Sequence, residues 1–294
     1  MAKKAYPYQE MPDSVKTKID QTTAPPAKIE GGLRVRGVLK QTLPNKPLLT
    51  VITVVFNGAE TIEHTIRSVI EQTYDNIEHI VIDGGSTDAT QDILRRYENN
   101  IDYWLSEKDA GIYDAMNKGI ALARGDYIGM LNSDDFFAKP SSLEIIAAHL
   151  KASNIDAVFS TLDIVNPGQL DSVLRKYRIS SYSKFMLRIG VMPPHPTFYC
   201  RKAAYEKAGP YRTDYRIAAD FEMLVRLLLK HHPTWEFIDE TTVKMRAGGL
   251  SNSGIRSRWI LNREIVRACA ENGLYTNMFM LLLKLPIRLL ERIL

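Results

Sequence analysis

The chain has 294 residues, of which 45% are hydrophobic and 24% are charged, and its formal net charge is +4 at pH 7. This is the composition of a globular protein, and the length suits one large α/β domain with appendages or two small domains. Lysine and arginine are spread along the chain rather than gathered in a stripe, which argues against a nucleic-acid-binding protein.

Three further features bear on the cellular location. The N-terminus has no apolar core of the kind that a signal peptide needs, and no uninterrupted apolar run reaches the roughly 18 residues of a membrane span. Cys200 and Cys269 lie in unrelated contexts, which favours buried thiols over a disulfide or a metal pair. We therefore expect a cytoplasmic protein.

In chain order, residues 1–47 are polar and contain several prolines, which predicts a flexible N-terminal arm. Order is expected to begin with LLTVITVVF at 48–56. A run that is apolar on both faces and rich in β-branched residues is typical of a central strand in a covered parallel sheet. Apolar residues then recur at helical spacing over 62–70, and a second strand is predicted at 77–83.

The alternation continues along the first half. A helix beginning near Asp88 precedes a strand at 101–106, and a helix at 114–123 precedes a strand at 126–131. This pattern predicts a doubly wound α/β sheet, in which ligands bind outside the carboxyl ends of the strands. No G-x-G-x-x-G follows the first strand, which disfavours a dinucleotide dehydrogenase.

The second half is less regular. Its predicted elements are strands at 158–165, 173–179 and 235–245, helices at 220–230 and 255–270, and a proline-rich segment without helix at 192–203.

Polar side chains follow three of the predicted strands: Asn57, Asp83 and the adjacent pair Asp134 and Asp135. Because ionised carboxylates are costly to desolvate without a partner, packing does not explain an acidic pair after an apolar strand. Adjacent carboxylates are suited to Mg²⁺ or Mn²⁺, which also binds phosphates. The alternative is that Asp134 caps the next helix and that Asp135 is solvated.

Asp83, in the segment IDGGSTD, also has two interpretations. Its carboxylate could accept hydrogen bonds from a ribose or a base edge, or the segment could simply form a tight turn before the next helix. The two are compatible if Gly84–Thr87 form the turn and Asp83 stays free to bind.

Four segments resemble a known family: VITVVFNGAETIEHTIRSVIEQTYDNIEHIVIDGGSTDAT, SEKDAGIYDAMNKGIALARGDYIGMLNSDD, PPHPTFYCRKAAYEKAGPY and RIAADFEMLVRLL. Their order and spacing resemble the inverting family 2 glycosyltransferases of the GT-A fold, of bacterial polysaccharide or colanic-acid type. The resemblance implies a GT-A type doubly wound mixed sheet flanked by helices over 48–253, then a C-terminal helical tail at 254–294. It also implies transfer of a sugar, with inversion, from a nucleotide diphosphate sugar to an acceptor hydroxyl in surface polysaccharide or glycolipid synthesis.

The same resemblance assigns site residues. Contacts with the nucleotide sugar fall on Phe56, Glu60, Asp83, Asn117, Asp134 and His195. The metal, Mn²⁺ or Mg²⁺, falls on Asp134 and Asp135, and the general base that deprotonates the acceptor falls on Asp220. Without the resemblance, Asp220 would be a helix N-terminal residue favoured by the dipole, and His195 a packed structural histidine.

Two positions depart from the family pattern. Asn132 stands where the first Asp of an Asp-x-Asp motif is usual, so the motif leaves open which of Asp134 and Asp135 holds the metal. Met116 stands where many relatives carry arginine, so a positive contact to the donor is missing there.

The final segment, 277–294, combines a basic stripe with apolar residues. Lys284, Arg288 and Arg292 are spaced by four, which places them on one face of a helix. The segment is too interrupted to span a membrane, but it could lie at the inner face of the cell membrane with its cations at anionic headgroups. Alternatively, it packs on the catalytic domain or on another subunit.

The expected partners are a nucleotide diphosphate sugar donor and a saccharide or lipid-linked saccharide acceptor, and no nucleic acid is expected. Two alternatives are a polyprenyl-phosphate sugar synthase and a non-catalytic nucleotide-sugar-binding module. An acceptor that accelerates donor consumption would separate a transferase from a binding module or from a nucleotide-sugar hydrolase.

Overall fold

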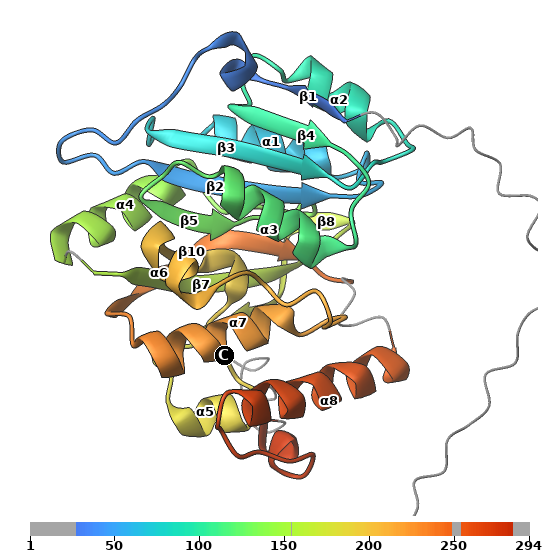
Figure 1. Cartoon of the computed structure of the whole chain (residues 1–294), viewed down its shortest axis with the longest axis vertical. Coiled ribbons are helices and arrows are strands. Elements are labelled where there is room, and N and C mark those ends of the chain that lie inside the picture. Colours follow the sequence, from blue (N-terminus) through green and yellow to red (C-terminus); the bar gives the residue numbers. More distant parts are fainter. Residues whose placement is uncertain (1–27, 154, 249–253, 285–294) are drawn as a thin grey trace, which may run out of the picture.

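The computed structural model describes residues 28–153, 155–248 and 254–284 (Figure 1). Within these ranges one mixed sheet has the strand order β1-β4-β3-β2-β5-β9-β7-β10-β6, and β8 pairs with β7. The strands are β1 (Ile29–Gly31), β2 (Leu49–Val55), β3 (Ile77–Asp83), β4 (Tyr103–Ser106), β5 (Tyr127–Met130), β6 (Asp135–Phe137), β7 (Ala157–Asn166), β8 (Gln169–Tyr177), β9 (Tyr199–Arg201) and β10 (Trp235–Arg246). The α-helices are α1 (Ile62–Ile70), α2 (Thr90–Arg96), α3 (Ile112–Leu122), α4 (Ser142–Ser153), α5 (Lys184–Arg188), α6 (Lys202–Ala208), α7 (Ala219–Arg226) and α8 (Ile255–Glu271). Shorter helical segments are η2 (Leu33–Arg36), η3 (His195–Thr197), η4 (Leu227–His231) and η6 (Met280–Leu283).

The first half of the chain builds the parallel part of the sheet. β3 pairs in parallel with β2 and β4, and β2 pairs in parallel with β5. All residues of β2, β3 and β5 are buried, as expected for apolar strands that are covered on both faces. The predicted alternation of strand and helix is confirmed, and the carboxyl ends of these strands lie at one edge of the sheet.

Helices cover both faces of this parallel part. Ile52 and Val54 of β2 share a core cluster with Met116 of α3 and with residues of α7. Leu49 and Val51, on the opposite face of the same strand, belong to a cluster with residues of α4. Figure 1 shows α3 and α7 in front of the sheet and α1 behind it. The sheet is therefore the middle layer of an α/β domain.

The second half of the chain makes the sheet mixed. β9 pairs antiparallel with both β5 and β7, and β10 pairs in parallel with β7 and antiparallel with β6. The helix predicted at 220–230 is α7, which continues as the π-helical segment η4. Both cysteines are buried free thiols, as predicted.

The helix predicted at 255–270 is α8, and it packs on the domain. Its Ile265, Ala268 and Cys269 are buried in the same core cluster as residues of α7. Among the described residues, no helix is both long enough and apolar enough to cross a bilayer.

The prediction of a flexible arm over 1–47 is wrong for its last part, which contains β1 and η2. Residues 1–27 lie outside the described ranges, but β1 pairs antiparallel with β4, with Gly31 opposite Trp104. A Cβ on Gly31 would lie 2.5 Å from the indole of Trp104, so only glycine lets this ring cover the strand. Arg34 then pairs with Glu78 at 2.5 Å. A three-residue strand held by its pairing with β4 and by contacts with distant residues has no periodicity that sequence analysis could detect.

Candidate functional site

The loops after β2 and β3 are fastened to each other at the carboxyl edge of the sheet. Gly84 N donates to Val55 O at 2.9 Å, and Asn57 N donates to Ser86 Oγ at 2.7 Å. The Asn57 side chain accepts from Thr87 N at 2.8 Å, and the Asn57 backbone is left-handed, with φ of 50°. Asn57 therefore uses its polar groups to hold the turn, and the two loops form one rim.

Asp83 lies at the end of β3 with its side chain fully buried. Its oxygens accept from Ser86 N at 3.1 and 3.2 Å, from the Ser86 hydroxyl, and from Ser106 Oγ at 2.5 Å. The expectation that the turn leaves this carboxylate free is wrong, because the neighbouring hydroxyls satisfy an acceptor that would be costly to bury alone. A contact between Asp83 and a nucleoside stays a prediction.

Phe56 and Glu60 lie on the solvent side of the same rim. Phe56 directly follows β2 and is 65% exposed, and Glu60 is exposed on the loop that leads to α1. An aromatic ring with most of its surface in solvent gains apolar burial when a planar ligand covers it. Both side chains are accessible, and their contact with a base stays a prediction.

The acidic loop between β5 and β6 is fastened to α1 by one hydroxyl. Thr65 is fully buried, and its Oγ1 bonds Ser133 O at 2.8 Å and Asp135 O at 2.7 Å. Within the loop, Asp135 N donates to Asn132 O at 3.0 Å. These bonds hold the loop at the same sheet edge as the rim after β2 and β3.

Two oxygens of this loop are buried without a hydrogen-bond partner among the described residues: Oδ1 of Asn132 and Oδ1 of Asp135. Asp135 is 1% exposed and begins β6, and its Oδ2 lies 3.4 Å from Asn132 Nδ2. Burial raises the pKa of Asp135 well above its ordinary value, and the nearby charge of Asp134 adds to this. The alternative of a helix cap with a solvated Asp135 is wrong, because a strand follows Asp134 and water does not reach Asp135.

The side-chain oxygens of this loop fit a hard divalent cation as ligands. An unpaired buried oxygen costs about 1–3 kcal/mol, so two together point to a ligand that binds them. With the partly exposed Asp134, the pair Asn132 and Asp135 offers the oxygen ligands that Mg²⁺ and Mn²⁺ take. The described ranges contain no group of three acidic, histidine or cysteine side chains suited to a metal. A cation at this loop would therefore keep several positions for water and phosphate oxygens.

Arg246, at the end of β10, is a cation beside this loop that the sequence analysis missed. Its Nη1 donates to Asp134 O, its Nη2 lies 3.0 Å from His64 Nδ1, and its Cζ lies 5.0 Å from the centre of the Phe136 ring. Burial lowers the pKa of Arg246, and the charges of Asp134 and Asp135 oppose this. Arg246 is 112 residues from Asp134 in the sequence, so only the pairing of β10 with β6 brings them together.

Asp220 lies in the first turn of α7 and is partly buried. Its Oδ1 accepts from Phe221 N at 2.7 Å, and burial raises its pKa to about 6. Burial also raises the pKa values of Tyr113 and Tyr211, and the nearby charge of Asp220 adds to both. These two rings are stacked with their centres 6.1 Å apart. A carboxyl group that titrates near pH 6 among aromatic rings is suited to general base chemistry.

Asn117 and His195 both bind Tyr211. Asn117 Nδ2 donates to Tyr211 O at 2.8 Å, and Asn117 Oδ1 accepts from Tyr211 N at 2.7 Å. His195 is 6% exposed, its Nε2 lies 2.8 Å from Tyr211 Oη, and burial lowers its pKa to about 4. The packed histidine of the alternative interpretation matches this burial, whereas a direct contact of either residue with the donor stays a prediction.

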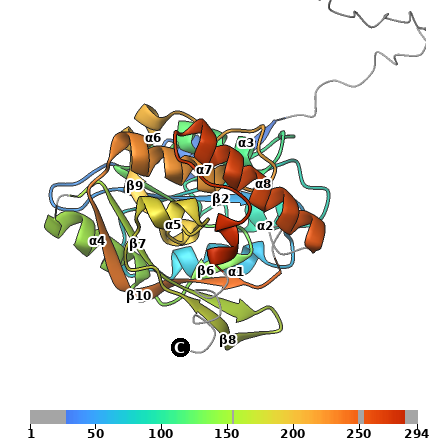
Figure 2. The same cartoon turned by 90° about the horizontal axis from the view of Figure 1, so that it is seen from below.

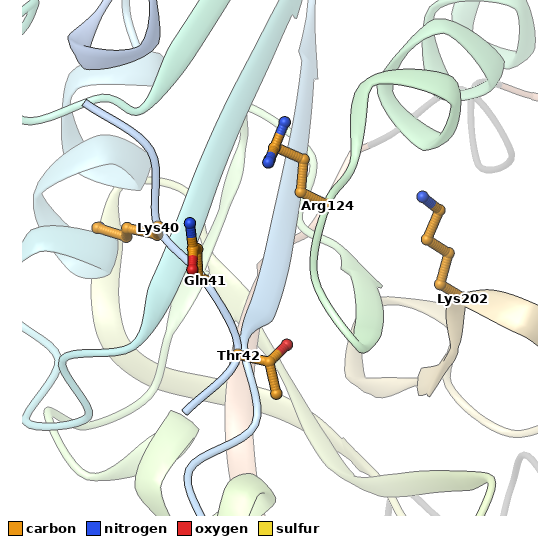
Figure 3. A pocket seen from close by; sticks show the side chains of 5 residues that line it. All are labelled: Lys40, Gln41, Thr42, Arg124 and Lys202. Atoms are coloured by element: carbon orange, nitrogen blue, oxygen red, sulfur yellow. The ribbon is translucent and has the colours of Figure 1, made fainter. Parts of the chain in front are cut away.

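A cavity of about 330 Å³ opens between the start of α3 and the segment before α7. It is lined by Ala110, Gly111, Ile112, Tyr113, Asp114, Thr213, Asp214, Tyr215 and Arg216. Because Tyr113 also lies beside Asp220, this cavity adjoins the candidate base. A second hollow of about 390 Å³ is lined by Lys40, Gln41, Thr42, Arg124 and Lys202 (Figure 3). It lies at the opposite edge of the sheet, because its residues precede β2 and β5 or follow the antiparallel β9.

Comparisons with known proteins concern the sequence and the fold of the chain. The family model described as "Glycosyl transferase family 2" matches residues 50–209. An uncharacterized glycosyltransferase of Mycobacterium tuberculosis is 36% identical over 194 residues, which cover 65% of this chain and 72% of the relative. A PGL/p-HBAD biosynthesis glycosyltransferase of Mycobacterium bovis is 27% identical over 219 residues, which cover 70% of this chain and 80% of the relative.

Solved structures share the fold. TarS 1–349 of S. aureus in complex with UDP has a TM-score of 0.58 at 19% identity, over 78% of this chain and 66% of that fragment. The same fragment with UDP-GlcNAc has a TM-score of 0.60 at 18% identity, over 78% of this chain and 67% of that one. The mannosyltransferase PcManGT of Pyrobaculum calidifontis in complex with GDP-Man and Mn²⁺ has a TM-score of 0.57 at 19% identity, over 83% of this chain and 70% of that one.

We expect Thr65→Val to destabilise the protein by about 1–3 kcal/mol, because two buried carbonyls lose their shared donor while the side-chain volume is unchanged. Urea unfolding of the variant and the wild type measures the difference. Thr65→Ser, which keeps the hydroxyl, is the matched control and should restore most of the loss. Equal stability of Thr65→Val and the wild type would show that this hydroxyl does not hold the acidic loop.

Proposed function

Because the chain belongs to glycosyl transferase family 2, we propose that it moves a sugar from a nucleotide diphosphate sugar to an acceptor hydroxyl, with inversion at the anomeric carbon, in surface polysaccharide or glycolipid synthesis. The observation that carries the proposal is the pair of unpaired buried oxygens of Asn132 and Asp135 at the carboxyl edge of the sheet. The ligands of the solved relatives support a nucleotide sugar as donor.

The donor diphosphate lies at the acidic loop in this proposal. Asn132, Asp134 and Asp135 hold Mn²⁺ or Mg²⁺, and Asp135, being buried, is the more constrained of the two carboxylates. When bound, the cation neutralises charge that builds up on the departing diphosphate. Arg246 adds a fixed positive charge at the same loop, where it compensates for the buried and uncharged Met116 of α3.

Asp220 is the general base. Its carboxylate takes the proton of the acceptor hydroxyl while the acceptor oxygen bonds to the anomeric carbon and the bond from that carbon to the diphosphate oxygen breaks. Because the acceptor attacks opposite the leaving group, the configuration inverts. The raised pKa of Asp220, about 6, places the base close to neutral pH, where general base catalysis typically contributes 10²–10⁴-fold.

The acceptor is a saccharide or lipid-linked saccharide, and the end of the chain brings the enzyme to the membrane that carries it. Exposed apolar side chains occur on η6, on the segment before it, on α5 and on α8: Phe185, Trp259, Tyr275, Met278, Phe279, Leu282 and Leu283. Figure 2 shows the dark red segment of η6 beside α5 and α8. Arg188 Nε donates to Tyr275 O at 2.7 Å, which fastens this segment to α5. We name these seven side chains the apolar surface.

Cations accompany the apolar surface, although not all of them are the predicted ones. Lys284 is 5% exposed and bonds Asn262 Oδ1 at 2.8 Å, so its predicted place among lipid headgroups is wrong. Arg288 and Arg292 lie outside the described residues. Arg256, Arg258 and Arg263 are exposed on α8 instead, and Arg263 Cζ lies 4.7 Å from the centre of the Trp259 ring. Exposed aromatic and aliphatic side chains beside arginines suit an anionic membrane surface.

Neither alternative from the sequence analysis is supported by a specific contact. A polyprenyl-phosphate sugar synthase would differ in its acceptor, which is a phosphate rather than a hydroxyl. A phosphate attacks as an anion and needs no group to remove a proton, so the raised pKa of Asp220 favours a hydroxyl acceptor.

The first test is calorimetry with nucleoside diphosphates. We expect the wild type to bind one of them in the presence of Mn²⁺, and to bind it at least about tenfold more weakly without the metal. Asp135→Asn should abolish the metal dependence, whereas Asp163→Asn, which changes another buried carboxylate of the same sheet, should not. Folded wild-type protein that binds no diphosphate, or binds one equally well without metal, contradicts the proposed donor site.

A second prediction concerns pH. Because the base must be ionised, kcat/KM should rise about tenfold per pH unit below about pH 6 and level off above it. Asp220→Asn should lower the rate by about 10²–10⁴-fold and remove this acid limb.

The same residue affects stability. The pKa of Asp220 is raised in the folded protein, so the unfolded chain releases this proton first as the pH rises from about 4 to 6, and stability falls over that range. Asp220→Asn lacks this loss and should be more stable at pH 7, by at most about 3 kcal/mol. A variant that is inactive and also less stable would show that Asp220 acts in packing.

Membrane contact is tested by co-sedimentation with lipid vesicles. The wild type should bind vesicles that contain phosphatidylglycerol and leave neutral phosphatidylcholine vesicles in the supernatant, because about 1 kcal/mol per basic residue comes from anionic headgroups. Phe279→Ser with Leu282→Ser should lose binding. Val173→Ser with Leu174→Ser removes two exposed apolar side chains from β8, away from this surface, and should keep vesicle binding. Equal binding by both double variants excludes this surface as the membrane contact.

A further inference from the structure

Recognition of a nucleobase at this edge of the sheet requires a side chain that can form a hydrogen bond with the edge of the base. Asp83, the acidic residue closest to the strand end, is fully buried, and its oxygens already accept three donors from Ser86 and Ser106. A carboxylate in this state has no oxygen exposed to solvent, so while the turn stays closed a base at this rim would meet another acceptor first.

Asp109 occupies the position that a side chain of residue 84 would take. A Cβ built on Gly84 would lie 2.5 Å from Asp109 Oδ2. The following residue, Gly85, is left-handed with φ of 80°, and a Cβ there would lie 3.2 Å from Lys108 N. Two consecutive glycines therefore let the loop after β4 close onto the loop after β3, which brings the Asp109 carboxylate to the end of β3.

One oxygen of Asp109 is fixed and the other is available. Oδ1 accepts from Gly111 N at 2.8 Å, and Oδ2 has no hydrogen-bond partner among the described residues. Lys118, whose positive charge acts on Asp109, is bound to Glu107 at 2.8 Å and lies 3.5 Å from Asp114. Asp109 is partly buried, and burial raises its pKa, which is the environment of a carboxylate that a ligand's donor would stabilise.

Phe56 lies on the loop after β2, whose strand end contacts Gly84. Val55, the residue before it, accepts the hydrogen bond of Gly84 N, so the exposed ring follows directly from the strand that borders β3. The exposed ring of Phe56 and the carboxylate of Asp109 thus both belong to loops that meet at Gly84, at the edge of the sheet. Aromatic side chains stack on nucleobases whatever the base, whereas a carboxylate accepts only from an N–H at the base edge.

We propose that Asp109 selects the nucleobase of the donor: its Oδ2 accepts a hydrogen bond from a ring N–H while the base stacks on Phe56. The proposal rests on the proposed function, because it assumes a nucleotide donor at this rim. It specifies that the base has a ring N–H at its edge. Uracil presents a ring N–H at N3 and guanine one at N1. Cytosine and adenine carry lone pairs at the corresponding ring nitrogens, and these would face the negative oxygen.

The test is calorimetry of the full chain with UDP, GDP, CDP and ADP in the presence of Mn²⁺. We expect UDP or GDP to bind at least tenfold more tightly than CDP and ADP. Asp109→Asn should weaken binding of the preferred diphosphate tenfold or more. It should also reduce the ratio of that affinity to the affinities for CDP and ADP, because an amide can also donate to a ring nitrogen. Gly84→Ala should have the same effect with Asp109 intact, since the added methyl group would displace its carboxylate.

Asp114→Asn is the matched control. It removes a neighbouring charge in the first turn of α3, 3.5 Å from Lys118, and should leave the preference unchanged. A wild type that prefers CDP or ADP overturns the inference. The inference is also overturned if both Asp109→Asn and Gly84→Ala keep the base preference of the wild type. In that case, metal-dependent binding of a diphosphate would still support the proposed function. Folded wild-type protein that binds no diphosphate overturns the proposed function itself.

Discussion

The parallel register of β2 against its neighbours is the constraint on which the rest of this site depends. Val55 lies opposite Asp83, Asp83 lies opposite Ser106, and Ile52 lies opposite Met130. The loops that follow these strands must therefore leave the sheet at the same edge, whatever their sequences. Because the strands are buried on both faces, a shift of register would expose apolar side chains or bury the polar loop residues, and the edge is held by the core itself.

The site holds polar groups in states that the fold alone would disfavour. The unpaired oxygens of Asn132 and Asp135 are buried, and Asp220 has a raised pKa. Such groups persist only where the surrounding structure fixes them. Thr65 does this for the acidic loop, because it lies on α1 and bonds two carbonyls of the loop at once. In the proposed function these groups bind ligands, so stability and ligand binding would be opposed at the same few residues.

Several polar residues near the site hold other side chains in place. Asn117 and His195 both hold Tyr211, and Tyr211 stacks on Tyr113 beside Asp220. A chain of hydrogen bonds and stacked rings thus runs from His195 in the proline-rich segment to the rings beside the candidate base. Such residues determine where a catalytic group points, and their substitution would disturb the base without removing any group that reacts.

The amino-acid sequence by itself determined the alternation of strand and helix, the buried thiols and the position of the acidic pair after a strand, because periodicity and local composition act over a few residues. Only the tertiary structure decided the rest. Arg246 reaches the acidic loop through the pairing of β10 with β6, and Asp109 reaches Gly84 through the packing of two loops. The engagement of Asp83 with Ser106 likewise depends on a neighbouring strand. These contacts join residues distant in the chain, and their geometry follows from the packed sheet rather than from local sequence.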